Sequence, residues 1–389
     1  MDDPKPTIAF DTEPLDALYR NQGIYVYTRT LLAQFRELAS GYGVEVCPFV
    51  SRRAENDANG FAPAPGFAPV SARWLHSSRM WRYGGAWLST RRMRPDVVFS
   101  PTFSTLQFRS GAARVVTIHD ATPVIMPNFA PMKVMRKLQF ALKHAARHSD
   151  RVITISQCSQ NDLARVLGIP ASKISVVYSG YDAERFNAES PDPAQMEGLR
   201  RKFGLERPYI FHHGFIQPRK NLKRLVQAFR RMTGRASGPE IDLVLAGGLG
   251  WRSEELVAEA RAAASPRGRV VMTGPLSDSD LVAMIKGSTL VVIPSLYEGF
   301  CLPMLEAMAC GVPVIAAASS CIPEISGNVL KYFDPESDEE IAERMTEALA
   351  EPGLRRELAE RGLARAREFS WRRCAEQTLA LLKEAARTG

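Results

Sequence analysis

The sequence predicts an α/β protein with two doubly wound parallel sheets, and three observations lead to this fold class. The chain has 389 residues, enough for two or three domains at about 150 residues each. Short, nearly continuous apolar runs rich in β-branched residues alternate with segments of helical periodicity. This alternation is typical of parallel sheets that are covered by helices on both faces. It occurs twice, once in each half of the chain.

Eleven segments are expected to form strands. In the first half they are Thr7–Asp11, Val44–Val50, Asp96–Pro101, Arg114–Asp120, Arg151–Ser156 and Ile174–Gly180. In the second half they are Tyr209–Gly214, Asp242–Gly248, Arg269–Gly274, Leu290–Ser295 and Val312–Ala318. Between the halves, the stretch NAESPDPAQ is polar, contains two prolines and has no periodicity. We therefore expect two domains, over 1–182 and 208–365, joined by a linker over 183–207.

The composition excludes several classes of protein. With 45% hydrophobic and 24% charged residues, the chain is neither disordered nor fibrous. No apolar run reaches the roughly 18 residues that a membrane span needs, and MDDPKPTIAF lacks the pattern of a signal peptide. The six cysteines form no CxxC pair, which argues against a disulfide framework or a zinc ribbon. These features predict a cytoplasmic protein with reduced thiols.

The net charge of +8 is unevenly distributed. Residues 61–155 contain 14 Lys and Arg against three acidic residues, an excess of 11, so the rest of the chain carries −3. An excess of this kind indicates an anionic partner, which could be a nucleic acid, a membrane surface or a phosphorylated substrate.

Two stretches carry most of the positive charge. Ser71–Arg94 interleaves six arginines with Trp and Tyr and contains no acid. Met132–Arg151 places lysines and arginines around four apolar residues at helical spacing, Met132, Met135, Leu138 and Leu142. Basic amphipathic helices commonly lie in membrane interfaces, so we expect peripheral contact with the anionic cytoplasmic face of a membrane. The alternative is a solvated basic face beside an ordinary core stripe. No nucleic-acid partner is expected, because no recognisable nucleic-acid module accompanies the charge.

Functional residues are expected just after strands, because ligands of open parallel sheets bind beyond the carboxyl ends of the strands. The segment YEGFCLPMLEAMACG follows the strand Leu290–Ser295 and contains Glu298, then Glu306 inside an expected helix. Gly299 permits a tight turn, so the N–H groups of the first helical turn can bind an anion or a hydroxyl. Two carboxylates and a helix N-terminus suit a polyhydroxylated, phosphorylated ligand. In the alternative interpretation, Glu298 caps the helix and Glu306 is simply exposed.

The segment FHHGFIQPRKNLKRL carries a second candidate site. Gly214 ends a strand, Arg219 and Lys220 follow in the loop, and Asn221 can cap the next helix. Adjacent cations at a helix N-terminus can neutralise a diphosphate, Arg through a bidentate fork and Lys as a point charge. A solvated basic pair beside a cap is the alternative.

Weaker signals come from the first half. His119, at the end of a strand, could hydrogen-bond a sugar hydroxyl or could be structural. Gly23, just before a helix, could let backbone N–H groups approach a phosphate. The sequence Asp278-Ser279-Asp280 spells a DxD motif, but its place at the start of a helix indicates capping. With no HExxH or cysteine partner for His212-His213 either, we expect no metal site.

Together, the order and spacing of these motifs resemble the group 1, or family 4, glycosyltransferases. The resemblance covers most of the chain and includes NQGIYVYTRTLL, RPDVVFSPTF, VVTIHDATPVIMP, GFIQPRKNLKRLVQAF and EGFCLPMLEAMACGVPVIA. Its most specific part is the succession along the chain of HD, RKN and the EGFCLPMLE segment. The family has the GT-B fold, in which two Rossmann-like domains face each other across a cleft.

The resemblance implies a metal-independent, retaining transfer of a hexose from a nucleotide diphosphate sugar, without a cofactor. The acceptor would lie on the first domain, completed by a C-terminal helix over 366–389, and the donor on the second. Lys220 would contact the diphosphate and Glu298 the donor sugar. Further donor contacts would come from these residues: Gly23, His119 near the sugar 6-position, Gly214, Arg219, Pro275 near the base, Gly299, Phe300, Cys301, Leu302, and Glu306 on the ribose.

Two departures from the family pattern affect these assignments. Many members have an arginine directly after the glycine equivalent to Gly214, where this chain has Phe215; Arg219 is expected to supply that charge. The family commonly reads EGFG, where this chain has Cys301, and a side chain there would narrow the sugar pocket.

The expected donor is a GDP-linked hexose such as mannose, and the expected acceptor is a glycan or lipid-linked glycan in cell-surface polysaccharide synthesis. Two alternatives remain: a nucleotide-sugar epimerase on the same fold, or a non-enzymatic basic binding or scaffold protein. The sequence does not define the oligomeric state.

Overall fold

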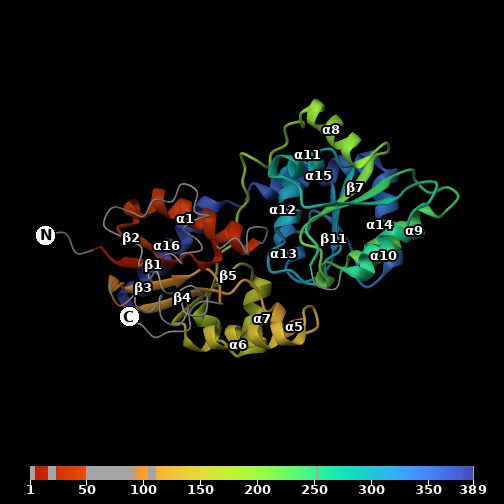
Figure 1. The fold of residues 1–389 in the computed structure, drawn as a ribbon. Coiled ribbons are helices and arrows are strands. Elements are labelled where there is room, and N and C mark those ends of the chain that lie inside the picture. The colour runs from red at the N-terminus through yellow and green to blue at the C-terminus, as the bar shows by residue number, and fades with distance from the viewer. Residues whose placement is uncertain are drawn as a thin grey trace. The chain divides into compact units, whose positions relative to one another are not determined.

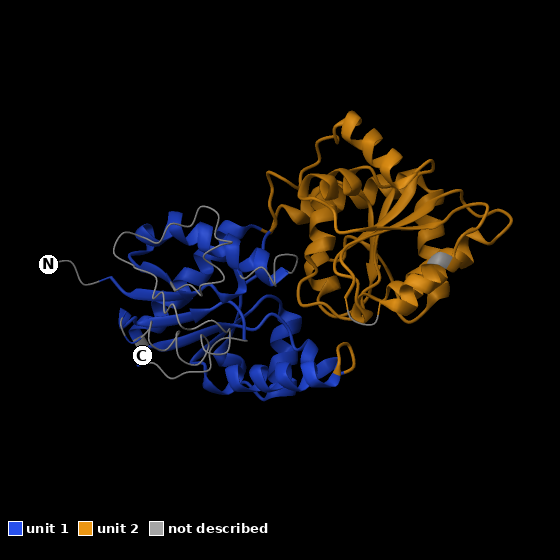
Figure 2. Cartoon of the chain, in the orientation of Figure 1, with its two compact units in different colours: residues 1–127, 132–180, 370–389 blue, residues 128–131, 181–369 orange. Residues whose placement is uncertain are grey.

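The structure, a computed structural model, describes residues 5–15, 23–49, 91, 93–103, 111–250 and 253–388. The chain forms two compact units (Figure 2). Unit 1 comprises residues 1–127, 132–180 and 370–389, and unit 2 comprises residues 128–131 and 181–369. Each unit contains a six-stranded parallel sheet (Figure 1). The predicted fold class, α/β with two doubly wound parallel sheets, is confirmed.

Unit 1 has the strand order β2-β1-β3-β4-β5-β6. The strands are β1 (Thr7–Asp11), β2 (Glu45–Phe49), β3 (Val97–Ser100), β4 (Ala113–Thr117), β5 (Arg151–Thr154) and β6 (Ile174–Val176). The described helices are η1 (Glu13–Leu15), α1 (Gly23–Tyr42), α5 (Thr122–Ile125), α6 (Met132–His148), α7 (Gln157–Leu167), η4 (Ala171–Lys173) and α16 (Trp371–Thr388). Five of the six strands lie within a segment that the sequence predicts as a strand, and β4 begins one residue before its predicted segment, Arg114–Asp120.

Helices cover both faces of this sheet, as the nearly continuous apolar strands require. α1 and α16 lie on one face, and α6 and α7 lie on the other (Figure 1). On the α6 face, Leu142 and Leu163 belong to one buried cluster with Val116 and Val152. The C-terminal α16 is part of unit 1, where the Lys383 ammonium donates to the carbonyl of Tyr42 at 2.6 Å.

Unit 2 has the strand order β12-β11-β10-β7-β8-β9. The strands are β7 (Tyr209–His213), β8 (Asp242–Ala246), β9 (Val270–Gly274), β10 (Leu290–Ile293), β11 (Val314–Ala317) and β12 (Lys331–Phe333). The helices are α8 (Pro193–Phe203), η5 (Pro218–Lys220), α9 (Leu222–Thr233), α10 (Glu254–Ala262), α11 (Asp278–Lys286), α12 (Leu302–Ala309), α13 (Ile322–Ser326), α14 (Asp338–Ala350) and α15 (Pro352–Ala366). The sequence does not predict β12, because Lys331–Phe333 lacks the run of β-branched apolar residues that marks the other strands.

The segment over 183–207, expected to be a linker, instead contains helix α8 and belongs to unit 2. Asp192 begins this helix by accepting a hydrogen bond from the N–H of Ala194, and Gly204 ends it in a left-handed conformation. Met196 and Leu199 are buried on its inner side. The two prolines suggested a break, but Pro193 lies in the first turn, where proline is compatible with a helix.

The strand order of unit 2 creates a switch point between β7 and β10. From β7 the chain continues through β8 and β9 to one edge of the sheet, and from β10 through β11 and β12 to the other. Ligands of doubly wound sheets bind at such a point, beyond the carboxyl ends of the strands. The loops after β7 and β10 carry the candidate residues Arg219, Lys220 and Glu298.

Candidate functional site

The loops after β7 and β10 place a carboxylate between two cations. The ammonium of Lys220 donates to Oε1 of Glu298 at 2.6 Å, and the guanidinium of Arg219 donates to Oε2 of the same carboxylate. The hydroxyl of Ser295 donates to Oε1 at 2.7 Å. We call Arg219, Lys220 and Glu298 the charge cluster. It carries one net positive charge.

The charge cluster is largely buried, and its most exposed side chain, that of Arg219, is 19% exposed. Lys220 and Glu298 are each 4% exposed. Burial alone would raise the pKa of Glu298, but Arg219, Lys220 and the hydrogen bond from Ser295 outweigh it and lower the pKa to about 2. Glu298 is therefore ionised at pH 7. It is not the helix cap of the alternative interpretation, because Cys301 occupies the N-cap position of α12.

Serine residues that sequence analysis did not identify hold the Glu298 loop. The N–H of Glu298 donates to Oγ of Ser320 at 2.9 Å, and the hydroxyl of Ser319 donates to the carbonyl of Ser295 at 2.6 Å. Ser319 and Ser320 follow β11, the neighbour of β10 in the sheet. Their position just after a predicted strand is the signal that could have identified them.

Asn221 does not cap α9 through its side chain, contrary to expectation. Its amide instead donates to the carbonyls of Pro294, at 3.1 Å, and Pro335, at 2.7 Å. The residue is left-handed, with φ 58°, a conformation that asparagine tolerates better than most residues. It ties the loop containing Lys220 to the segments that follow β10 and β12.

Replacement of Asn221 by alanine is expected to lower the free energy of unfolding by about 3 kcal/mol. The change leaves the carbonyl of Pro294 without its side-chain donor, at about 1–3 kcal/mol, and keeps a strained backbone, at about 1–2 kcal/mol, whereas the carbonyl of Pro335 still accepts from Arg224 at 3.0 Å. Asn221→Gly loses the same hydrogen bonds but relieves the strain, so it should be about 1 kcal/mol less destabilised. Urea denaturation measures both variants. Equal stability of the alanine variant and the parent would contradict this account.

Glu306, on α12, lies beside His213 at the end of β7. His213 Nε2 lies 3.7 Å from Oε2 of Glu306 and donates to the carbonyl of Pro303 at 3.3 Å. Burial, His212 and Lys220 lower the pKa of His213 to about 3, so its ring is neutral at pH 7 and the contact is not an ion pair. Burial raises the pKa of Glu306 to about 7, although Arg185 and Lys220 oppose the rise. Glu306 is thus a carboxyl that changes charge near neutral pH.

Glycine residues allow a close approach of backbone beside the charge cluster. Gly214 has φ 134°, and a Cβ atom there would lie 3.7 Å from the ammonium of Lys220. Gly247, after β8, has φ 142°, and a Cβ atom there would lie 1.9 Å from the carbonyl oxygen of Gly214. The N–H of Gly247 donates to the carbonyl of Gly274, at the end of β9. The absence of a side chain at Gly247 therefore allows the Gly214 loop to lie directly against the loop after β8.

The remaining candidates of unit 2 extend from the charge cluster along the same edge of the sheet. Phe300 is buried against Phe369, with ring centroids 5.6 Å apart. Cys301 is left-handed, with φ 67°, and precedes Leu302, the first residue of α12. Gly299 lies between Glu298 and Phe300 in this loop. Pro275 follows β9, and a Cβ atom at Gly248 would lie 3.9 Å from it. The structure gives no contact between Pro275 and the charge cluster.

His119 and Gly23 belong to unit 1. Nε2 of His119 donates to the carbonyl of Pro101 at 2.9 Å, and its ring meets Tyr27 of α1 edge to face, at 4.7 Å between centroids. Burial lowers the pKa of His119, so the ring is neutral at pH 7. Gly23 begins α1, one turn before Tyr27.

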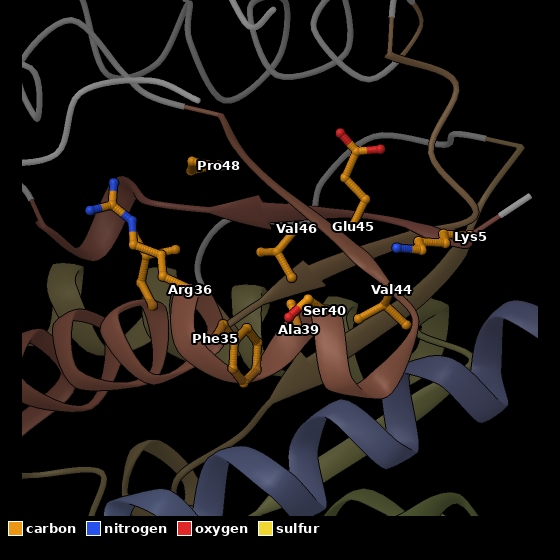
Figure 3. A pocket seen from close by; sticks show the side chains of 10 residues that line it. Lys5, Phe35, Arg36, Ala39, Ser40, Val44, Glu45, Val46 and Pro48 are labelled. Carbon is orange, nitrogen blue, oxygen red and sulfur yellow. The ribbon is translucent and has the colours of Figure 1, made fainter. Parts of the chain in front are cut away.

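Unit 1 also contains a cavity of about 480 Å³ between α1 and β2 (Figure 3). Its lining is mainly apolar and includes Phe35, Val44 and Val46, with Lys5 and Arg36 at its border. None of the candidate site residues lines it.

The described residues contain no group of three or more His, Cys, Asp or Glu side chains placed to hold a metal ion. In the DxD sequence, the N–H of Asp280 donates to Oγ of Ser277, the N-cap of α11. The DxD residues thus lie at the start of a helix, as expected, but the cap is Ser277, and Asp278 and Asp280 belong to the first turn.

Two family models match the chain. Residues 196–365 match glycosyl transferases group 1, and residues 22–185 match glycosyltransferase family 4. The chain is 28% identical over 390 residues to the O-antigen chain mannosyltransferase B of Escherichia coli, covering 96% of this chain and 98% of that protein. It is also 28% identical over 267 residues to the serotype-specific mannosyltransferase WbdA of Escherichia coli. That match covers 66% of this chain but only 32% of the relative.

Solved structures share the fold at low sequence identity. The crystal structure of Anabaena HepE in complex with UDP and glucose matches with a TM-score of 0.71 at 19% identity, over 97% of this chain and all of that one. Sucrose-phosphate synthase from Thermosynechococcus elongatus matches with a TM-score of 0.72 at 20% identity, over 99% and 100% of the two chains.

The two Rossmann-like units and these matches define the protein as a glycosyltransferase with the GT-B fold. More specifically, the chain belongs to the group 1, or family 4, glycosyltransferases. The family resemblance of the sequence is thereby confirmed. Its relatives include proteins named as mannosyltransferases, one of them an O-antigen chain mannosyltransferase.

Proposed function

We propose that the protein transfers a hexose from a nucleotide diphosphate sugar to a glycan or lipid-linked acceptor with retention of the anomeric configuration. The observation that carries this proposal is the buried charge cluster at the switch point of unit 2. Its net positive charge suits a diphosphate, and the preorganised positions of Lys220 and Arg219 suit a leaving group whose negative charge grows during the reaction.

Cleavage of the sugar–phosphate bond leaves positive charge on the sugar and negative charge on the diphosphate. Lys220, Arg219 and the N–H groups at the start of α12 would stabilise that negative charge more in the transition state than in the ground state. In this proposal these groups stabilise the departing diphosphate without a metal ion or a cofactor. His119 would bind near the sugar 6-position from unit 1, where Gly23 would contribute backbone N–H groups.

Glu298 is poorly suited to attack the sugar, because both of its oxygens accept hydrogen bonds from cations and its pKa is about 2. We therefore assign it to positioning the cations and binding the donor sugar. A phosphate oxygen on the departing diphosphate would accept the proton of the acceptor hydroxyl. The sugar–acceptor bond then forms on the same face of the ring from which the diphosphate leaves, which gives retention.

The other donor contacts follow from position along the carboxyl edge of the sheet. The backbone of Gly299, Phe300 and Cys301, with Leu302, would hold sugar hydroxyls, and Glu306 would accept from the ribose. Gly214 would let the backbone approach the phosphates, and Pro275 would border the base.

We propose a GDP-linked hexose, with mannose first, as the donor. Relatives that are named mannosyltransferases support the choice of sugar, and the O-antigen relative supports an acceptor used in polysaccharide synthesis. A lipid-linked acceptor would require the protein to work at a membrane surface, and we propose peripheral contact with its anionic cytoplasmic side. Within the described residues, no helix is long and apolar enough to cross a membrane.

Thermal-shift measurements with GDP-mannose, UDP-glucose, dTDP-glucose and ADP-glucose test the donor, because a ligand that binds the native state raises Tm. GDP-mannose is expected to raise Tm most, and Lys220→Met to abolish the rise. Transfer to membrane extract, with the anomeric configuration of the product determined by NMR, tests the reaction. A donor that is isomerised without transfer would indicate an epimerase instead. If no nucleotide sugar raised Tm or was consumed, the proposal would fail.

Donor affinity is expected to depend on pH through Glu306. Its carboxyl has a pKa of about 7, so it is ionised above pH 7 and protonated below. A charged acceptor binds ribose hydroxyls more strongly, by about 1 kcal/mol, so donor affinity should fall about three- to fourfold as the pH decreases from 8 to 6. Glu306→Gln should remove this dependence. Titration calorimetry at several pH values measures the donor affinity. If the Gln variant kept the pH dependence of the parent, Glu306 would be excluded as the cause of that dependence.

A further inference from the structure

We propose that the outward face of α6 is a docking surface for an anionic lipid membrane. α6 has 17 residues, and seven of them are exposed. These seven, which we call the basic–apolar face, are Met132, Lys133, Arg136, Lys137, Phe140, Lys143 and Arg147. Five are cations, two are large apolar residues, and the helix contains no acidic residue. At 1.5 Å per residue, the face extends about 22 Å along the helix.

The core of unit 1 determines which side of α6 is exposed. Leu142 and Ala145 are buried in the cluster with Val116 and Val152, so the helix cannot rotate to bury its other side. The sequence predicts Met132 on the apolar stripe, but the structure leaves it 69% exposed, and Phe140 is 64% exposed. These are two of four large apolar side chains exposed among the described residues. The apolar stripe expected from the sequence is therefore divided: Met135 and Leu142 are buried in unit 1, whereas Met132 is exposed.

The five cations of the basic–apolar face form no ion pair with an acidic side chain of the described residues. Their positive charge therefore remains available to an anionic surface, whose attraction decays within a Debye length of about 8–10 Å.

The mixture of side chains identifies the partner as a membrane. Lysine and arginine can contact lipid phosphates and carboxylates while Met132 and Phe140 enter the boundary with the acyl chains, about 5–10 Å deep. A nucleic acid would use the cations but would leave both apolar side chains in water. The other basic stretch, Ser71–Arg94, lies outside the described residues except for Arg91, Met93 and Arg94, so α6 alone carries the inference.

Vesicle co-sedimentation of the full chain tests this surface. The vesicles contain either equal amounts of phosphatidylserine and phosphatidylcholine or phosphatidylcholine alone. No nucleotide sugar is present, so the result is independent of the proposed transferase activity. We expect binding to the anionic vesicles only, and weaker binding as NaCl rises from about 0.1 to 1 M, because the Debye length shortens from about 10 to 3 Å.

A quadruple variant, with Lys133, Arg136, Lys137 and Lys143 changed to Ser, should bind anionic vesicles at least tenfold more weakly. Each cation near such a surface contributes about 1 kcal/mol, or about fivefold in affinity, before screening. The matched control changes four exposed cations of unit 2 to Ser and removes the same total charge: Arg201, Lys202, Arg235 and Arg356. The control should bind as the parent does.

A second variant tests the apolar contribution. Met132→Ser with Phe140→Ser should weaken binding severalfold without changing the charge, whereas Leu249→Ser, at a side chain of unit 2 that is 57% exposed, should not. Equal weakening in both quadruple variants would assign the binding to net charge and overturn the role of α6. The proposal would also be overturned if the parent protein bound RNA but did not bind vesicles. Circular dichroism excludes unfolding as the cause of any loss.

Discussion

Glu298→Ala is expected to lower kcat for sugar transfer by about 10²- to 10³-fold, the typical effect of removing one preorganised charge-stabilising group. The carboxylate holds the ammonium of Lys220 at 2.6 Å and also holds the guanidinium of Arg219. Without it, two largely buried cations repel each other and leave the positions that the departing diphosphate requires. The effect should appear in kcat at saturating donor. Wild-type turnover in the variant would refute the assignment of the site.

The same substitution is expected to destabilise the fold by about 3–5 kcal/mol, because it leaves buried cations uncompensated. Since the pKa of Glu298 is lowered from 4.5 to about 2, its stabilising effect is present above pH 4.5 and is lost as the pH falls towards 2. The stabilities of parent and variant should therefore converge in acid. Urea denaturation between pH 3 and pH 7 measures this.

A surface ion pair of unit 2 provides the control. Lys223 and Glu255 are 2.9 Å apart, close to the 2.6 Å of Lys220 and Glu298, but the Glu255 side chain is 79% exposed. Exposed pairs contribute about 0–1 kcal/mol, so Glu255→Ala should leave both kcat and stability nearly unchanged. A comparable loss in both variants would show that the effect of Glu298 does not come from its buried position.

Gly247→Ala is expected to lower the free energy of unfolding by about 4 kcal/mol and to impair transfer as well. A Cβ atom at this position would lie 1.9 Å from the carbonyl oxygen of Gly214, and neither group is at the end of a flexible side chain. The loops must separate, at about 1–3 kcal/mol, and alanine must adopt φ 142°, at a further cost of about 1–3 kcal/mol. Because Gly214 borders Lys220, the separation should also weaken donor binding.

Gly198→Ala is the matched control for Gly247→Ala. Gly198 lies inside α8 of the same unit, and a Cβ atom there would have no neighbour within 4 Å. Alanine in this helix should raise stability by about 1 kcal/mol, because it favours the helix more than glycine does. Urea denaturation compares the two variants. A Gly247 variant as stable as the parent would show that the loops after β7 and β8 can move apart freely.

Much of the site could be predicted from local patterns. Arg219, Lys220 and Glu298 were identified because each lies in a loop after an apolar run, and parallel strands place such loops at one edge of a sheet. The supporting contacts could not be predicted in the same way. Ser320 lies 22 residues from Glu298, and the two meet only because β11 pairs with β10. Asn221 carries an ordinary capping signal, yet its amide donates to carbonyls 73 and 114 residues away.

The sequence by itself determined the fold class, the positions of eleven strands and the charged residues after them, because periodicity and strand composition are local properties of the chain. The tertiary structure alone decided that β7 lies beside β10, so that a lysine and a glutamate 78 residues apart share a buried hydrogen bond. It also placed 183–207 within a packed unit and turned Met132 and Phe140 outward. Strand order and burial depend on which distant segments pack together in one core. No single stretch of the sequence contains that information.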